Sequence, residues 1–178
     1  VSMYGTTCRV NVQDASIGQD YDYPSDEEEV QDAGVVFGEA AVVVVAPDGV
    51  HMTYPDRGWE WNSEDLQVAA AVQARVTEDG VAALGSDCTV TNIAGSVRDV
   101  TALGEGMDCS GAGFTATPAG DAFVATGTDV ISVNGDGVSS FGVAADLAVW
   151  DASADVLYVA TAGDSLLLGL EADGGVRF

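Results

Sequence analysis

Hydrophobic positions along the chain fall into short runs, and almost nowhere do they follow the period of a helix. Runs such as "AAVVVVA" (residues 40–46) are rich in β-branched residues, and Gly-Asp, Asp-Gly and Gly-Ser pairs stand between the runs. This is the pattern of strands and tight turns. Residues 62–75 also allow a helix capped by Ser63, but the same stretch is acceptable as a strand, which we favour. The pattern therefore predicts an all-β protein.

The strands and turns repeat along the chain. Residues 79–90, 121–132 and 156–168 each contain an apolar strand, a short turn ending in Asp and a second strand. The turn aspartates recur roughly every 40 residues, and a further turn follows in each copy. The aspartates are Asp87, Asp129 and Asp164, and the further turns are Ala94-Gly95-Ser96, Asp136-Gly137 and Asp173-Gly174.

An earlier copy of the repeat lies in residues 34–54. We place Gly38-Glu39 at its first turn and Asp48-Gly49 at its second. About four units of roughly 40 residues match the spacing of a four-stranded propeller blade. A small antiparallel sheet cannot bury both of its faces alone, so neighbouring sheets must stack face to face. The last unit is predicted to form strands at 147–150, 156–161, 166–171 and 176–178.

The predicted fold is therefore all-β, built from antiparallel four-stranded repeats in a propeller-like arrangement, with an antiparallel β-sandwich as the alternative. The repeats of residues 35–178 resemble β-propeller proteins with loose repeats, of the pyrroloquinoline-quinone-binding-like or NHL-like kind. The resemblance implies sheets arranged radially, with these four units as part of a larger ring. Residues 1–34 are assigned to a separate segment, an N-terminal strand ("CRVNV") followed by an acidic loop.

The charge of the chain excludes several kinds of partner. There are 29 acidic residues and 5 basic ones, giving a formal net charge of −24. Nucleic acids and anionic lipids need cations to neutralise their phosphates, so neither is expected to bind. No apolar run approaches the ~20 residues that span a bilayer. A solubilising shell, a high-salt habitat, a divalent cation or a basic partner would each account for the acidity.

The densest acidic stretch is residues 14–32, which contains no basic residue. Clustered carboxylates suit Ca²⁺, which takes six to eight oxygen ligands and tolerates irregular geometry. Two other interpretations stay open: a solvated linker, and a segment that docks on a basic protein partner. The candidate calcium ligands are Asp20, Asp22, Asp26, Glu27, Glu28 and Glu29.

Aromatic residues crowd the segment 53–62, "TYPDRGWEWN", which we interpret as a long connection between strands. Tyr54, Trp59 and Trp61 are its candidate binding residues. Aromatic side chains on loops bind protein partners, or carbohydrate by stacking on the sugar ring. The alternative is that these three side chains cover the end of the core.

The three cysteines are Cys8, Cys88 and Cys109. Cys88 and Cys109 follow the similar sequences "GSD" and "GMD", and these two cysteines are the candidates for a disulfide. With one histidine and no Cys-x-x-Cys motif, a zinc or thiol-redox site has little support. We favour an oxidising compartment, which means the periplasm, the cell surface or the extracellular space. The partner of Cys8 stays open.

One string imitates a catalytic motif. Residues 163–166, "GDSL", resemble the nucleophile motif of the GDSL-type serine hydrolases, and Asp48-x-x-His51 resembles the other half of that apparatus. In that family the serine comes first and opens a helix, whereas here Ser165 comes late and precedes a strand. The position after the turn Asp holds Val or Cys in the other units, so a turn explains it without a nucleophile. We therefore predict no catalytic residues and no enzymatic activity.

Together these features predict a non-catalytic, exported binding or scaffolding module without a resident cofactor. Its expected partners are proteins or assembly neighbours, with carbohydrate as a further option. The alternative is a calcium-stabilised structural or adhesion component of a cell-surface or extracellular assembly. A GDSL-like hydrolase is the remote third choice.

Overall fold

The computed structural model describes residues 30–46, 49–54, 59–61, 66, 68, 70–161, 167–171 and 174–177. All elements with defined bounds in this part of the chain are strands, and they form four antiparallel sheets. The sheets consist of β1 (Val30–Val36), β2 (Glu39–Ala46), β3 (Gly49–Tyr54) and β4 (Trp59–Trp61); β5 (Ala71–Thr77), β6 (Gly80–Gly85), β7 (Thr89–Ala94) and β8 (Val97–Ala102); β9 (Gly113–Ala116), β10 (Ala122–Ala125), β11 (Val130–Asn134) and β12 (Gly137–Ser140); and β13 (Leu147–Asp151), β14 (Val156–Ala160) and β15 (Leu167–Leu170).

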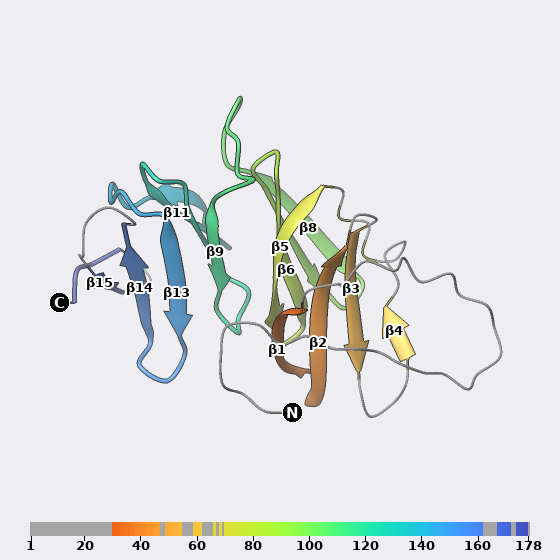
Figure 1. The fold of residues 1–178 in the computed structure, drawn as a ribbon. Helices are drawn as coiled ribbons and strands as arrows, with labels where there is room; N and C mark the ends of the chain where they lie inside the picture. The colour runs from red at the N-terminus through yellow and green to blue at the C-terminus, as the bar shows by residue number, and fades with distance from the viewer. Residues whose placement is uncertain are drawn as a thin grey trace.

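Each sheet is a meander in which neighbouring strands follow one another in the chain. The sheets lie side by side in sequence order, from the first at the right of Figure 1 to the fourth at the left. The prediction of an all-β fold made of antiparallel units is confirmed, and four sheets are present in place of the two of a sandwich. The fourth sheet has three strands, and Val176 adds only an isolated bridge to Leu170. Strand β1 begins at Val30, upstream of the predicted boundary at residue 35.

The prediction that Gly38-Glu39 corresponds to the turns of Asp87 and Asp129 is wrong, because it lies one turn earlier in its sheet. Asp87 and Asp129 lie between the second and third strands of their sheets. In the first sheet that connection is the one between β2 and β3, whereas Gly38 lies between β1 and β2. A unit with four strands has three turns, so two turns seen in the sequence fit the repeat in either of two positions.

The favoured strand in residues 62–75 is present in its second half, where β5 begins at Ala71. Before it, Leu66 is helical, and Leu66 and Val68 are buried in the core between the first two sheets. The strand assignment is therefore correct from Ala71 onward and wrong at Leu66.

The hydrophobic core lies in three layers, one between each pair of successive sheets. Strand β6 is buried along its whole length because both faces of its sheet are covered. Val81 and Ala83 pack toward the first sheet, while Ala82 and Leu84 pack toward the third. In each layer the first strand of one sheet lies beside the first strand of the next: β1 lies beside β5, β5 beside β9, and β9 beside β13.

Gly34 on β1 allows the first two sheets to approach closely, so Gly34→Ala is expected to destabilise the protein by about 1–2 kcal/mol. A Cβ atom at this position would lie 2.8 Å from Val76 Cγ1. Val76 is branched at Cβ and has little rotamer freedom with which to move aside. Urea unfolding measures the loss. The matched control is Gly111→Ala, where an added Cβ meets nothing within 4 Å, and an equal loss in both variants would contradict the steric explanation.

Candidate functional site

The residues predicted as binding or metal sites fall partly outside the described chain. The six candidate calcium ligands of residues 20–29 all lie there, so the calcium site stays a prediction from sequence. Among the described residues, no group of three or more His, Cys, Asp or Glu side chains is placed to hold a metal ion. No helix in the described part of the chain is long and apolar enough to span a membrane.

The aromatic segment is a strand hairpin, which corrects the expectation of a long connection. Tyr54 ends β3 and pairs with Trp59, the first residue of β4, while Trp61 pairs with Met52. The structure thus brings Tyr54 and Trp59 together as cross-strand partners in the first sheet. The sequence could not reveal this strand because β4 is only three residues long.

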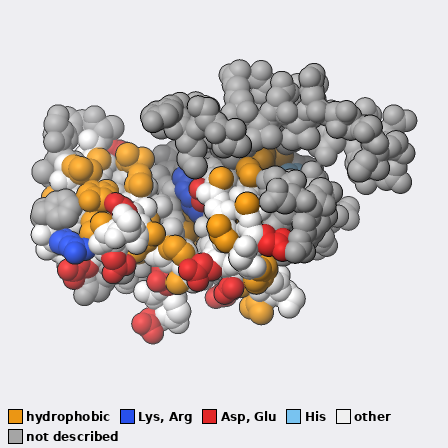
Figure 2. All heavy atoms as spheres, turned by 90° about the horizontal axis from the view of Figure 1, so that it is seen from below, with side chains coloured by type: hydrophobic (Ala, Val, Ile, Leu, Met, Phe, Trp, Pro, Cys, Tyr) orange, Lys and Arg blue, Asp and Glu red, His pale blue; other side chains and the backbone are white. Residues whose placement is uncertain are grey.

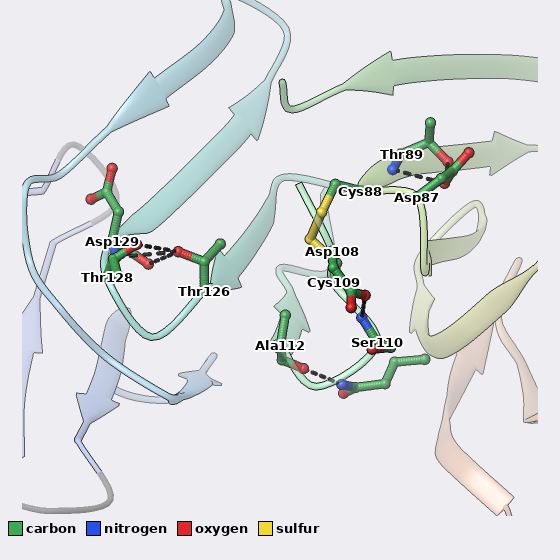
Figure 3. Close-up of a disulfide and its surroundings, with 11 residues drawn as sticks. Asp87, Cys88, Thr89, Asp108, Cys109, Ser110, Ala112, Thr126, Thr128 and Asp129 are labelled. Atoms are coloured by element: carbon green, nitrogen blue, oxygen red, sulfur yellow. Dashed lines mark hydrogen bonds between the residues drawn. A yellow bond between two sulfur atoms is a disulfide. The ribbon is translucent and has the colours of Figure 1, made fainter. Parts of the chain in front are cut away.

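Cys88 and Cys109 form a disulfide with their Cα atoms 5.1 Å apart (Figure 3). Both residues are fully buried, and backbone hydrogen bonds hold the loop between them and the sheet. Cys109 N donates to Ser86 O and Leu103 N donates to Cys88 O, each at 3.0 Å. The bridge therefore ties the turn between β6 and β7 to the loop that leads into the third sheet. Disulfides of this kind form and persist in oxidising compartments.

The turn aspartates serve as hairpin residues. The Asp87 carboxylate accepts hydrogen bonds from the hydroxyl of Thr89 at 2.7 Å and from its backbone N at 3.2 Å (Figure 3). Asp129 Oδ1 accepts hydrogen bonds from the backbone N of Val130 at 2.8 Å and of Gly142 at 2.9 Å. These bonds shape the turns, as short polar side chains commonly do.

The equivalent turn in the fourth sheet contains the Gly-Asp-Ser-Leu string and lies outside the described residues, as does Asp48. His51 lies on β3, in the first sheet. The connection that carries Ser165 joins β14 to β15 in the fourth sheet, at the other end of the series of sheets (Figure 1). A turn role for Asp164 and Ser165 stays a prediction.

One cation, Arg75, lies where β1, β5 and β9 come together. Its Nη1 donates to Ala74 O at 2.8 Å and its Nη2 to Gln73 Oε1 at 3.2 Å, and its guanidinium carbon lies 5.9 Å from the centre of the Phe114 ring. Burial lowers the pKa of Arg75, an effect that attraction from Asp32 opposes. The guanidinium stays charged because its pKa is far above neutrality. Its contacts make Arg75 a structural residue that links three strands.

A groove between the second and third sheets is acidic. Its volume is about 220 Å³, and its walls include the carboxylates of Asp79, Asp99 and Asp121. Asn92 Nδ2 donates to Gly120 O at 3.2 Å, and the buried Asn92 Oδ1 has no hydrogen-bond partner among the described atoms. The groove suits small cationic or hydrogen-bond-donating groups. Its carboxylates do not form a group placed to hold a metal ion.

One group of exposed apolar side chains lies on one face of the fourth sheet, which we call the fourth-sheet end face. Residues on the opposite face pack on the third sheet, whereas this face is directed away from it. Three of its side chains are about half exposed: Leu147 by 54%, Val149 by 48% and Leu167 by 57%. The pairing of β13, β14 and β15 aligns on this face Leu147, Val149, Tyr158, Ala160, Leu167 and Gly169, and at its edge Asp151 and the buried Val156.

Asp151 is the one acidic residue that β13, β14 and β15 place on this face, although the chain contains 29 acidic residues. On the side of the molecule that carries the fourth sheet, Figure 2 shows exposed hydrophobic side chains with acidic and basic side chains beside them. Asp151 lies at the border of the face, where hydrogen bonds from the Ser153 hydroxyl and from the backbone N atoms of Ala154 and Ser153 hold its pKa below the ordinary value. A contiguous exposed apolar face with a polar border is typical of an interaction surface.

Comparison with known proteins identifies the fold and no family. No protein-family model matches the chain, and no curated protein matches it. A solved structure from Bacteroides caccae, described as a protein of unknown function, superposes with a TM-score of 0.56 at 16% identity, over 88% of this chain and 62% of that protein. PorZ of Porphyromonas gingivalis, described as an essential bacterial surface component of the type-IX secretion system, superposes with a TM-score of 0.53 at 10% identity. That match covers 86% of this chain and 21% of PorZ. At such low identities the likeness concerns the fold alone, and the chain spans less than two thirds of either protein.

Proposed function

We propose that the chain is a non-catalytic, exported module of propeller-like β-repeats that binds other proteins through the fourth-sheet end face. The observation that carries the proposal is this face, which exposes Leu147, Val149 and Leu167 and has one carboxylate at its edge, in a chain with a net charge of −24. Leaving such a face in water forgoes roughly 25 cal/mol for each Å² of apolar surface that a partner would cover. A surface so different from its surroundings is therefore expected to be covered by another protein.

Two further observations support export to the cell surface or beyond. The buried Cys88–Cys109 disulfide is typical of an oxidising compartment. One protein with a similar fold, PorZ, is described as a surface component of a secretion system. The role proposed for this chain is accordingly that of a binding or scaffolding part in a surface assembly.

A photo-cross-linking amino acid at Leu147 tests the proposal in the cells that produce the protein. We expect covalent protein adducts from position 147, because that side chain lies on the fourth-sheet end face and is 54% exposed. The matched control position is Val97 on β8, which is 66% exposed but lies outside that face. A second variant that also carries Val149→Asp should lose the adducts.

Equal adducts from positions 147 and 97, or none from position 147, would contradict a role for this face in protein binding. Adducts that persist unchanged with Val149→Asp would do the same, because a charge placed beside Leu147 must be desolvated by any partner that packs there.

A further inference from the structure

We propose that the loop between β8 and β9 is a proteolytic processing site, at which an endopeptidase that recognises an acidic side chain cuts the chain after Glu105. The Cys88–Cys109 disulfide spans this position, so the two parts of the cut chain stay joined. The site lies between the second and third sheets and is independent of the fourth-sheet end face.

The β8–β9 loop, residues 103–112, leaves the sheets and projects from the molecule (Figure 1). Glu105 and Gly106 form the turn at its tip, and Gly106 has a φ of +73°, which favours glycine. In the described part of the chain, no backbone hydrogen bond joins residues 104–108 to a sheet. Exposed loop tips with small residues are preferred sites of proteolytic cleavage. The tip can therefore extend into the cleft of a protease without disturbing either sheet.

The packing of the loop leaves Glu105 available to the specificity pocket of a protease. Leu103 and Met107 are partly buried and pack on the core between the second and third sheets. The Asp108 carboxylate accepts a hydrogen bond from the backbone N of Ser110 at 3.0 Å. Glu105 is exposed and has glycine on both sides. A protease pocket selects the side chain that it can surround, so this loop suits an endopeptidase with a preference for glutamate.

The cleavage is a hydrolysis of the peptide bond between Glu105 and Gly106. Glu105 keeps the oxygen of the water as a new carboxylate, and both hydrogens pass to the Gly106 nitrogen, which becomes an ammonium group. No oxidation or reduction is involved, so the disulfide is unchanged by the reaction.

The cut chain stays one folded molecule for two reasons. Cys88 precedes the cut and Cys109 follows it, so the disulfide joins the two parts. Each strand of the second and third sheets lies wholly on one side of the cut, and the buried core between these sheets, which includes Leu84 and Phe114, is left intact. Burial of this apolar surface continues to hold the sheets together.

Glu78 provides a comparison within the chain, because it is also exposed in a turn, between β5 and β6. Its backbone N donates a hydrogen bond to Pro118 O, and its backbone O accepts one from Phe37 N, each at 2.8 Å. These bonds fix the turn to the neighbouring sheets on both sides. The turn cannot extend into a protease without breaking them, so we expect cleavage at Glu105 and none at Glu78.

Limited digestion of the whole folded chain with a glutamyl endopeptidase tests the site. We expect cleavage after Glu105, identified by mass spectrometry. The product should migrate as one molecule until a reducing agent separates a fragment that ends at residue 105 from one that begins at residue 106. Cuts at residues 27–29 shorten only the first fragment and are recognised by mass. Glu105→Gln is the matched control and should lose this cleavage while keeping the melting temperature of the unmodified chain.

A folded chain that stays uncut at Glu105 would overturn the inference, as would equal cleavage at Glu78 or loop cleavage that is unchanged in Glu105→Gln. The cut, oxidised chain should unfold with a fall in melting temperature smaller than the roughly 6–12 °C expected for loss of the disulfide. After reduction its melting temperature should depend on protein concentration, because the two parts then associate as separate molecules. Parts that separate before reduction would contradict the joined form.

The same pair of chains tests processing by the cells that produce the protein. The unmodified chain recovered from outside the cells should give both fragments on a reducing gel, whereas Glu105→Gln should give the intact chain. An unmodified chain that is recovered intact would overturn processing at this loop.

Discussion

Replacing Phe123 by Ala is expected to lower the free energy of unfolding by about 3–5 kcal/mol, the usual cost of deleting a buried aromatic side chain. Phe123 on β10 is fully buried between the third and fourth sheets. Its ring stacks on that of Trp150, with the centroids 5.6 Å apart and the planes 14° from parallel. The centroid of the Phe141 ring lies 6.0 Å from that of Phe123. Urea unfolding measures the loss, and the melting temperature should fall by roughly 6–20 °C.

The fourth sheet should be affected first, because among the four sheets that the structure describes it packs only on the third. In arrays of stacked units each unit depends on its neighbours, so losing this contact should raise hydrogen exchange most in β13, β14 and β15. The matched control is Phe37→Ala, since Phe37 is 56% exposed and its deletion opens no buried cavity. Similar losses in the two variants would show that burial between the sheets is not the source of the stability.

Removing the disulfide with Cys88→Ala and Cys109→Ala is expected to cost about 3 kcal/mol, or roughly 6–12 °C in melting temperature. The bridge closes a loop with a sequence separation of 21, so it limits the freedom of the unfolded chain as well as fixing the loop before β9. Differential scanning calorimetry with and without a reducing agent measures the effect.

The unmodified chain should lose stability on reduction, whereas the double variant should not change. Cys8→Ala serves as the control, and its melting temperature should respond to the reducing agent as that of the unmodified chain does. A double variant as stable as the oxidised chain would mean that the packing of the loop, and not the covalent bond, holds this region.

The sequence was sufficient to predict the bounds of strands that are separated by clear turn residues. The strands predicted at 147–150 and 156–161 match β13 and β14, because Asp and Gly residues at the turns fix where each strand ends. The first unit was less well predicted since its turns fit the repeat in two positions. The strand predicted at 176–178 appears only as the bridge between Val176 and Leu170, a reduction that no local pattern indicates.

The fourth-sheet end face could not be predicted, for a physical reason. A strand covered on both faces is apolar at successive positions, and β6 and β13 have this pattern alike. Whether a sheet follows on the second face depends on tertiary arrangement and leaves no mark in the strand itself. The candidate site, formed by Leu147, Val149 and Leu167, therefore emerged only from the exposure of these side chains in the structure.

The disulfide also decides how the chain responds to mechanical force. It holds the Cα atoms of Cys88 and Cys109 5.1 Å apart, whereas the chain between them would extend to about 70 Å. A force applied to the two ends of the chain passes through the sulfur–sulfur bond and bypasses β7 and β8, which lie wholly inside the loop. Half of the second sheet is thus protected from tension for as long as the bond stays oxidised.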